Sequence, residues 1–332
     1  MTEDAAGMPR VAVVGCGRWG RNHVRNYAEL GALAAVVDAD GALAAEQAGR
    51  YGVPALSFEA ALCDPGIAGL VFALPPSQNL PLGTRALEAG KDLFVEKPLA
   101  LSAADGETLC RIAEERDRVL MVGHILRYHP AFAELLGIVR AGRLGRLLSV
   151  VSTRLDLGAV RREEDALWAL APHDLSMLLA LAGQEPDAVS AFGGYGTHPA
   201  IADTTTLALR FPGGLAAEIR SSWLHPYKEQ RLVVVGTDAM AVFDDREGWE
   251  RKLVLHRYRI AETGGTAAVE RSEPEPVELA PGEPLRLQCA QFLRSIRSRE
   301  VPRTDGREGL RVLRVLEAGS AALRTGHHAI RL

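Results

Sequence analysis

Glu96 and Lys97 are the residues whose types and position most directly indicate chemistry. They follow the apolar run Leu93–Val95, and Pro98 comes directly after them. If the run is a buried parallel strand, both charged side chains emerge at its carboxyl end, where open α/β sheets bind their ligands. Taken alone, a surface lysine that begins a loop explains the pattern equally well. Lysine is scarce in this chain, however, which holds only Lys91, Lys97, Lys228 and Lys252 against many arginines.

A second candidate is His173, which follows Pro172 within an apolar segment. Proline is favoured at the first position of a helix, so we expect a helix that begins at Pro172 and carries His173 in its first turn. The dipole at a helix N-terminus disfavours imidazolium, so His173 is expected to be neutral and able to accept a hydroxyl proton. A capping or packing histidine is the alternative for these residues taken alone.

The N-terminal residues predict a dinucleotide site. An apolar run at residues 11–14 leads into a glycine loop, and a helix-like segment, a second apolar run and an acid follow within about thirty residues. The glycines serve a tight turn, close approach of a pyrophosphate and helix–strand packing, in the order Gly15, Gly17 and Gly20. Asp38 has the spacing expected of an acid that binds the ribose 2′-hydroxyl, and its charge would repel a 2′-phosphate. We therefore expect NAD to be preferred over NADP.

The remaining elements extend this pattern. Strand-like and helix-like segments alternate as far as residue 122, and Leu74 and Pro75 end one strand in a loop expected to lie over the cofactor. Short apolar runs from Ala188 onward, separated by turn sequences, predict hairpin-connected strands. Glu262–Pro281 is expected to be a mobile loop. We predict a nucleotide-binding domain at residues 1–123 and a substrate-binding and oligomerisation domain at residues 124–332, with the C-terminal helices near their junction.

Composition argues against several classes of protein. A net charge of −4 gives no reason to expect nucleic acid as a partner. The four cysteines lie far apart in neither a metal-ligand nor a disulfide pattern, so no metal is expected. The N-terminus does not resemble a signal peptide, and no apolar run is long enough to cross a membrane. We therefore expect a soluble cytoplasmic protein.

Five motifs, in order, resemble the glucose–fructose oxidoreductase, inositol dehydrogenase and rhizopine-catabolism (Gfo/Idh/MocA) family of NAD(P)-dependent oxidoreductases. The resemblance covers essentially the whole chain. It implies an α/β fold with an N-terminal Rossmann domain and a C-terminal α+β domain built on an open, largely antiparallel sheet. The free face of such a sheet suggests a homo-oligomer, either a dimer or a tetramer. The motifs are Gly15–Gly20, Leu74–Ser77, Glu96–Pro98, Gly123–Pro130 and Ala171–Leu175.

The resemblance also implies roles for individual residues. Lys97 and His173 would be catalytic, with Lys97 contacting substrate and nicotinamide ribose, His173 acting as acid or base, and Pro98 often cis. The implied cofactor contacts are Gly15, Gly17, Arg18, Trp19, Gly20, Asp38, Leu74, Pro75, Glu96, Lys97 and Trp168. The implied substrate contacts are Lys97, Arg127, Tyr128, Arg154, His173 and Lys228.

The local sequence looks most similar to members that act on nucleotide-linked or amino sugars, several of which oxidise the ring C3 hydroxyl. We expect an NAD-dependent dehydrogenase of this kind. A cyclitol or aminocyclitol dehydrogenase and a non-catalytic NAD- and sugar-binding regulator are the alternatives. Two departures bear on this choice: Ala169 stands where the family usually has an aspartate, and Gln78-Asn79 replaces a frequent Thr-His.

Overall fold

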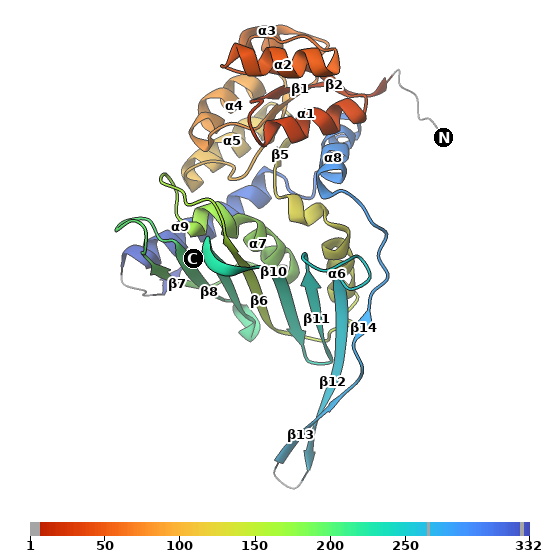
Figure 1. Ribbon diagram of the computed structural model, residues 1–332, viewed down its shortest axis with the longest axis vertical. Helices are drawn as coiled ribbons and strands as arrows, with labels where there is room; N and C mark the ends of the chain where they lie inside the picture. The colour runs from red at the N-terminus through yellow and green to blue at the C-terminus, as the bar shows by residue number, and fades with distance from the viewer. Residues whose placement is uncertain (1–6, 264–265, 326–328) are drawn as a thin grey trace. The chain divides into compact units, whose positions relative to one another are not determined.

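A computed structural model describes residues 7–263, 266–325 and 329–332. The chain forms two compact units (Figure 1). The first contains the described residues up to Tyr128 together with Glu283–Leu313, and the second contains His129–Gly282 and the described part of Arg314–Leu332. Residues 124–128 and 283–313, which the sequence placed in the second domain, thus group with the first unit.

The first unit is built on five parallel strands in the order β2-β1-β3-β4-β5. Their residues are apolar almost throughout and buried, as expected for strands covered by helices on both faces. The chain leaves the centre in opposite directions from β1 and β3, so the crevice outside their carboxyl ends is the place where such sheets bind ligands. The strands are β1 (Val11–Val14), β2 (Leu33–Val37), β3 (Gly69–Phe72), β4 (Asp92–Val95) and β5 (Leu120–Val122).

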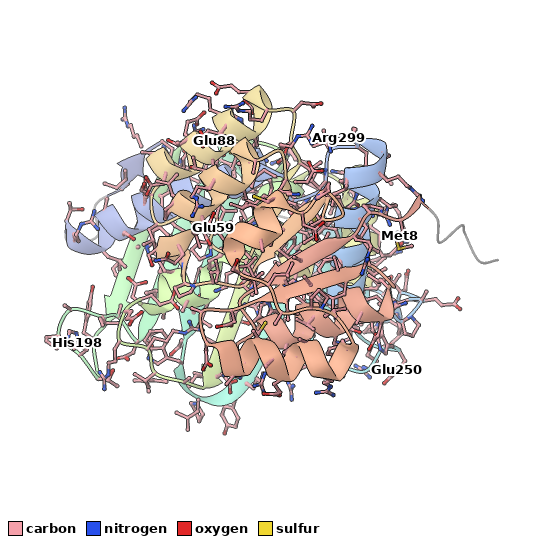
Figure 2. The ribbon with its side chains drawn as sticks, turned by 90° about the horizontal axis from the view of Figure 1, so that it is seen from above. Met8, Glu59, Glu88, His198, Glu250 and Arg299 are labelled. Carbon is pink, nitrogen blue, oxygen red and sulfur yellow. The ribbon has the colours of Figure 1, made fainter. Side chains whose placement is uncertain are left out.

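Three of the helices that connect these strands begin at residues of the types that commonly cap helices. Asp40, Ser57 and Ser102 each accept a hydrogen bond from a backbone N–H in the first turn that follows. Figure 2 shows the helices with their side chains, with Glu59 on α3 and Glu88 on α4 labelled. They are α1 (Gly20–Glu29), α2 (Gly41–Tyr51), α3 (Phe58–Cys63), α4 (Asn79–Glu88) and α5 (Ala103–Glu115), with the short turns η2 (Pro76–Gln78) and η3 (Ile125–Tyr128).

Helix α8 (Pro284–Ser298) returns to the first unit because its apolar stripe completes that core. Leu285, Cys289, Phe292 and Ile296 recur at helical spacing and pack in the same cluster as residues of β1, β2 and β4. Helix α9 (Gly306–Arg324) follows and contributes to both units. Its small residues allow close packing, since a Cβ on Gly309 would lie 2.6 Å from Cγ2 of Val122.

The second unit is a large, mostly antiparallel sheet in the order β13-β12-β11-β10-β6-β9-β8-β7-β15, with β14 beside β12. Within the described part of this sheet, β6 and β9 are the only parallel neighbours. Helices α6 (Pro130–Arg140) and α7 (Ala166–Ala182) pack on one face (Figure 1). The strands are β6 (Leu147–Leu157), β7 (Ala188–Gly194), β8 (Thr204–Arg210), β9 (Ala216–Ser222), β10 (Leu224–Gly236), β11 (Ala239–Asp244), β12 (Leu253–Thr263), β13 (Thr266–Arg271), β14 (Glu275–Pro276) and β15 (Ile330–Arg331), with η4 (Pro212–Gly214) between β8 and β9.

The prediction that a helix begins at Pro172 is wrong. Asp165 is the N-cap, accepting a hydrogen bond from the N–H of Trp168, and Pro172 lies inside α7. The six residues between this cap and the proline are good helix formers, so the carboxylate cap sets the start and the helix continues through the proline. His173 is therefore well inside the helix, and the argument that a helix N-terminus keeps it neutral no longer applies.

The prediction of a mobile loop at Glu262–Pro281 needs a correction in part, because residues 262–263, 266–271 and 275–276 form strands. Strands β12 and β13 pair from Tyr258 with Arg271 to Thr263 with Thr266, and β14 pairs with β12. The pair extends beyond the neighbouring strands (Figure 1). Residues 264 and 265, which fall within the predicted loop, lie outside the described residues. The Thr, Glu and Pro content suggested a loop, but cross-strand pairing decided the conformation.

Asp203 organises the segment between β7 and β8. Its carboxylate accepts hydrogen bonds from the N–H groups of Gly196 (2.8 Å) and Thr197 (2.7 Å), the Thr197 hydroxyl (2.7 Å) and Nε1 of Trp223 (2.6 Å). Burial alone would raise the pKa of Asp203, but these donors lower it to about 2.

Asp203→Ala is expected to lower the free energy of unfolding by about 2–4 kcal/mol, because four donors lose their charged acceptor. The native pKa is depressed, so this stabilisation is present above the ordinary pKa near 3.8 and is lost as pH falls toward 2. Urea unfolding between pH 7 and pH 2.5 measures both effects. Asp187→Ala is the control, since Asp187 forms an exposed pair with Arg210 and should cost below about 1 kcal/mol. Equal losses in the two variants would contradict the assignment.

Candidate active site

The glycine loop has the geometry of a phosphate cradle. Gly15 follows β1 with a φ of +96°, and a Cβ there would come within 2.4 Å of the Ala73 carbonyl oxygen. A Cβ on Gly20 would lie 1.8 Å from the carbonyl oxygen of Gly15. Both positions therefore require glycine for packing within the protein. Gly17 is different, because a Cβ there meets nothing within 4 Å. Open space in front of the Gly17 backbone is what a bound pyrophosphate needs.

Asp38 lies at the end of β2 beside this loop. Its Oδ2 accepts the N–H of Cys16 at 2.6 Å, and its Oδ1 accepts the N–H of Asp40 at 2.8 Å. The two bonds fix the carboxylate at the position where Rossmann folds bind the adenosine ribose. The residues present therefore fit the adenosine and pyrophosphate groups of a dinucleotide.

The other predicted cofactor contacts are distributed over both units. In the first unit, Arg18 and Trp19 are exposed at the start of α1, and Leu74 packs against Gly15, with Pro75 next along the loop. Trp168 is in the second unit, where its Nε1 donates to Oγ of Ser320 at 2.8 Å. The role of each in binding the cofactor stays a prediction.

Glu96 and Lys97 do emerge at the carboxyl end of β4, and the Lys97–Pro98 peptide is cis. In the sequence, Asn79 stands out only as a departure from the family pattern. In the structure Asn79 is buried, and its Nδ2 donates to the carbonyl oxygens of Pro98 (3.1 Å) and Leu99 (3.3 Å). Asn79 therefore fixes the segment that follows Lys97, and a polar residue at the start of a helix, three positions after the second of two prolines, was the only signal for it.

The three lysines other than Lys97 have oxygen atoms as partners. Lys91 donates to two carbonyl oxygens, of Asp64 and Ile67, at the other end of β4. Lys252 is bound to Asp245, and Lys228 lies 3.4 Å from Asp156 on the surface of the second unit. The contact of Lys228 with a substrate stays a prediction.

Glu308 of α9 contacts two residues of the Gly123–Pro130 motif, which follows β5. Nδ1 of His124 lies 2.7 Å from one Glu308 oxygen, and a guanidinium nitrogen of Arg127 lies 3.4 Å from the other. The side chain of Tyr128 is buried, and its hydroxyl bonds to Thr304 at 3.1 Å. The contact of Tyr128 with a substrate stays a prediction. Burial also raises the pKa of Tyr128 to about 12. Arg127 stays a predicted substrate contact.

In the second unit, the surroundings of His173 depend on Asp174. Asp174 is buried and accepts hydrogen bonds from the hydroxyl of Ser152 (2.7 Å) and from Nε of Arg154 (2.6 Å), with a further guanidinium bond at 3.1 Å. This bidentate pair anchors α7 to β6. Arg154, predicted to bind substrate, is mostly buried in this ion pair, and its substrate contact stays a prediction.

The structure also shows why Ala169 is tolerated. Ala169 is buried in a small cluster with Ala166 and Trp223, against which Leu170 and Ile201 pack. Asp165 cannot replace the missing carboxylate, since it caps the helix, and Asp174 is committed to Arg154. None of these three positions supplies His173 with the aspartate of the family pattern.

Three further findings concern metals, membranes and cavities. Among residues 7–263, 266–325 and 329–332, no group of three or more His, Cys, Asp or Glu side chains is arranged to hold a metal ion. In the same described part of the chain, none of the helices combines the length and hydropathy needed to cross a membrane. A cavity of about 390 Å³ in the first unit lies where β5 begins, and none of the predicted site residues lines it.

Gly17→Ala is expected to leave the fold intact and to lower NAD affinity by at least about tenfold, because the added methyl occupies space that only a ligand needs. Calorimetric titration of NAD, with thermal unfolding in parallel, measures both. Gly49→Ala, an open position on α2, is the control and should leave NAD affinity unchanged. Equal NAD affinity in the two variants would argue against this cradle.

Comparison with known proteins gives two family matches. A model described as an oxidoreductase family with an NAD-binding Rossmann fold matches residues 9–124. A model described as a GFO/IDH/MocA C-terminal domain matches residues 132–242. Together they cover both kinds of sheet seen in the structure.

Individual relatives agree with these matches. UDP-N-acetylglucosamine 3-dehydrogenase of Acidithiobacillus ferrooxidans is 30% identical over 309 residues, which cover 92% of this chain and 94% of the relative. Its solved structure superposes with a TM-score of 0.84 at 28% identity, covering 95% and 97% of the two chains. The scyllo-inositol 2-dehydrogenase (NAD(+)) of Bacillus subtilis is 29% identical over 69% of this chain and 72% of its own. An NAD complex of GenD2 from gentamicin A biosynthesis shares the fold, with a TM-score of 0.83 at 21% identity over 100% and 99% of the chains.

Proposed function

Because this chain belongs to the GFO/IDH/MocA family of oxidoreductases, we propose that it is an NAD-dependent dehydrogenase acting on a secondary ring hydroxyl. The substrate class is a sugar, amino sugar or nucleotide sugar, and ring C3 is the expected position of oxidation. The similarity to UDP-N-acetylglucosamine 3-dehydrogenase over most of both chains supports this class.

One observation carries the proposal. The open backbone at Gly17, the fixed carboxylate of Asp38 and the Glu96-Lys97 pair all lie at the carboxyl edge of the same parallel sheet. One rigid sheet therefore carries both the loop that would bind the dinucleotide and the ammonium that would act on the substrate.

The chain's own groups have distinct tasks in this reaction. NAD, when bound, supplies the nicotinamide that accepts or returns a hydride. Lys97, as an ammonium, stabilises the negative charge that develops on the substrate oxygen. His173 accepts the hydroxyl proton during oxidation and returns it during reduction. The Asp174–Arg154 pair keeps the helix that carries His173 in one orientation on β6.

The scyllo-inositol relative favours a second candidate, a cyclitol or aminocyclitol dehydrogenase that uses the same groups. A non-catalytic NAD- and sugar-binding regulator is a third possibility, and Ala169 is its main support. The open face of the second sheet fits the expected homo-oligomer, which is proposed here with the rest of the function.

Asp38 should decide the choice of cofactor. Asp38→Asn keeps the size of the side chain and removes its charge, so we expect the preference for NAD over NADP to narrow by about tenfold. Titration of both cofactors against the wild type and the variant measures the ratio. An unchanged ratio would show that Asp38 does not face the ribose.

The function itself is tested by absorbance of reduced nicotinamide with a panel of nucleotide sugars, amino sugars and cyclitols. Lys97→Ala should reduce turnover by about 10²–10³-fold and His173→Ala by about 10²–10⁴-fold, while NAD affinity stays within severalfold. Lys91→Met, at the opposite end of β4, controls for the loss of a lysine and should keep its turnover.

The panel separates the candidates. Turnover with cyclitols alone would select the second candidate. Sugar binding without reduction of NAD, in either direction of the reaction, would select the regulator. Near-normal turnover of Lys97→Ala would exclude the mechanism above.

A further inference from the structure

His23 is a fully buried histidine in the first unit that the proposed mechanism does not use. It lies on α1, three residues after Gly20. Its Nε2 is 2.7 Å from Oε1 of Glu96, and its Nδ1 is 3.8 Å from Sγ of Cys289. Both ring nitrogens therefore face specific partners in the core.

The surroundings of the ring favour one tautomer. A carboxylate can only accept, so Nε2 must carry the proton that is shared with Glu96. Burial raises the pKa of the Cys289 thiol, which keeps its proton and can donate weakly to Nδ1. Tyr27 stacks on the ring at 6.3 Å between centroids, and Phe94 meets it edge-on at 5.1 Å. The imidazole is thus held in place on its faces as well as at its nitrogens.

Glu96 connects His23 to the backbone of Lys97 at the carboxyl edge of the sheet. Only 13% of its side chain is exposed, and its second oxygen accepts the N–H of Lys97 at 3.2 Å. The carboxylate also lies against Gly123 at the end of β5, where a Cβ would come within 2.7 Å of Oε2. A carboxylate this enclosed needs its donors, because an unsatisfied buried charge is costly.

We propose that His23 is a positioning residue that holds Glu96, and through it the backbone of Lys97, in a fixed relation to the glycine loop. The link is direct, since α1 begins at the glycine loop and carries His23 one turn later. Without His23, the Glu96 carboxylate regains its hydrogen bonds only by turning out toward water, away from the Lys97 N–H. The inference rests on the proposed function, because it concerns the lysine to which that function gives a catalytic part.

The test compares variants of His23 that differ only in the donor. His23→Leu removes it, whereas His23→Gln places an amide N–H near the position of Nε2. We expect His23→Leu to lower both kcat/KM and NAD affinity by about 10–100-fold, and His23→Gln to restore both to within severalfold of the wild type. Ile296→Ala, in the same core cluster, is the control: it should lower the thermal midpoint but leave NAD affinity within about twofold.

A double-mutant cycle identifies the route. If His23 acts through Glu96, the His23→Leu/Glu96→Ala double variant should be no worse than the poorer single variant. Additive losses would overturn the inference, as would equal losses in His23→Leu and His23→Gln, which would indicate packing alone. Wild-type values in His23→Leu would overturn it as well.

A measurement on the wild-type protein tests the hydrogen bond between His23 and Glu96 even if the variants fail to fold. In the ¹⁵N spectrum of histidine-labelled protein, the His23 resonance should show Nε2 protonated, and a neutral ring protonated at Nδ1 would overturn the inference. If no substrate in the panel reduces NAD, the proposed function fails. NAD affinity across the variants and the tautomer still decide the role of His23.

Discussion

The close approach of backbone to backbone at the glycine loop is the constraint on which the first unit depends. Gly20 touches the carbonyl of Gly15, and Gly15 touches the carbonyl of Ala73 at the end of the neighbouring strand. Any side chain at either position would separate β1, α1 and β3. Because α1 is held this tightly, His23 reaches Glu96 and the open backbone of Gly17 faces the crevice where the strand order reverses. Gly15 and Gly20 thus serve packing within the protein, whereas Gly17 leaves space for a ligand.

Buried carboxylates organise the rest of the molecule in a common way. Asp92 is held by Arg299 and by the N–H of Val119 in the first unit, and Glu308 is held by His124. Asp174 and Asp203 are enclosed by donors in the second unit. Each joins segments that are distant in sequence, and each is fully supplied with donors, which is the condition under which a buried charge is tolerated. Asp174 and, in the first unit, Glu96 each lie next to a candidate catalytic residue in the sequence.

The absence of an aspartate at position 169 also has a physical consequence. The family pattern places a carboxylate one helical turn before the histidine, where it can share its proton. Here that face of α7 is apolar and covered by Trp223, whose indole N–H is engaged by Asp203. The departure is therefore accommodated by a packed cluster rather than by an empty space. In the proposed dehydrogenase, position 169 therefore cannot share the proton of His173.

The sequence by itself determined the elements whose signals are local. The Ser102 cap marks the start of α5, the apolar spacing within Pro284–Ser298 is that of a helix, and the glycine spacing with Asp38 predicts the βαβ unit. These features depend on neighbours within a few turns, where capping and periodicity act directly. Tertiary structure decided the rest. The start of α7 at Asp165, the pairing of β12 with β13 and the return of α8 to the first core each depend on contacts with distant segments. The partners of His23 and Asn79 likewise come from other strands and helices. Sequence order cannot reveal such partners, because a buried polar side chain is satisfied by whatever donor the fold brings beside it.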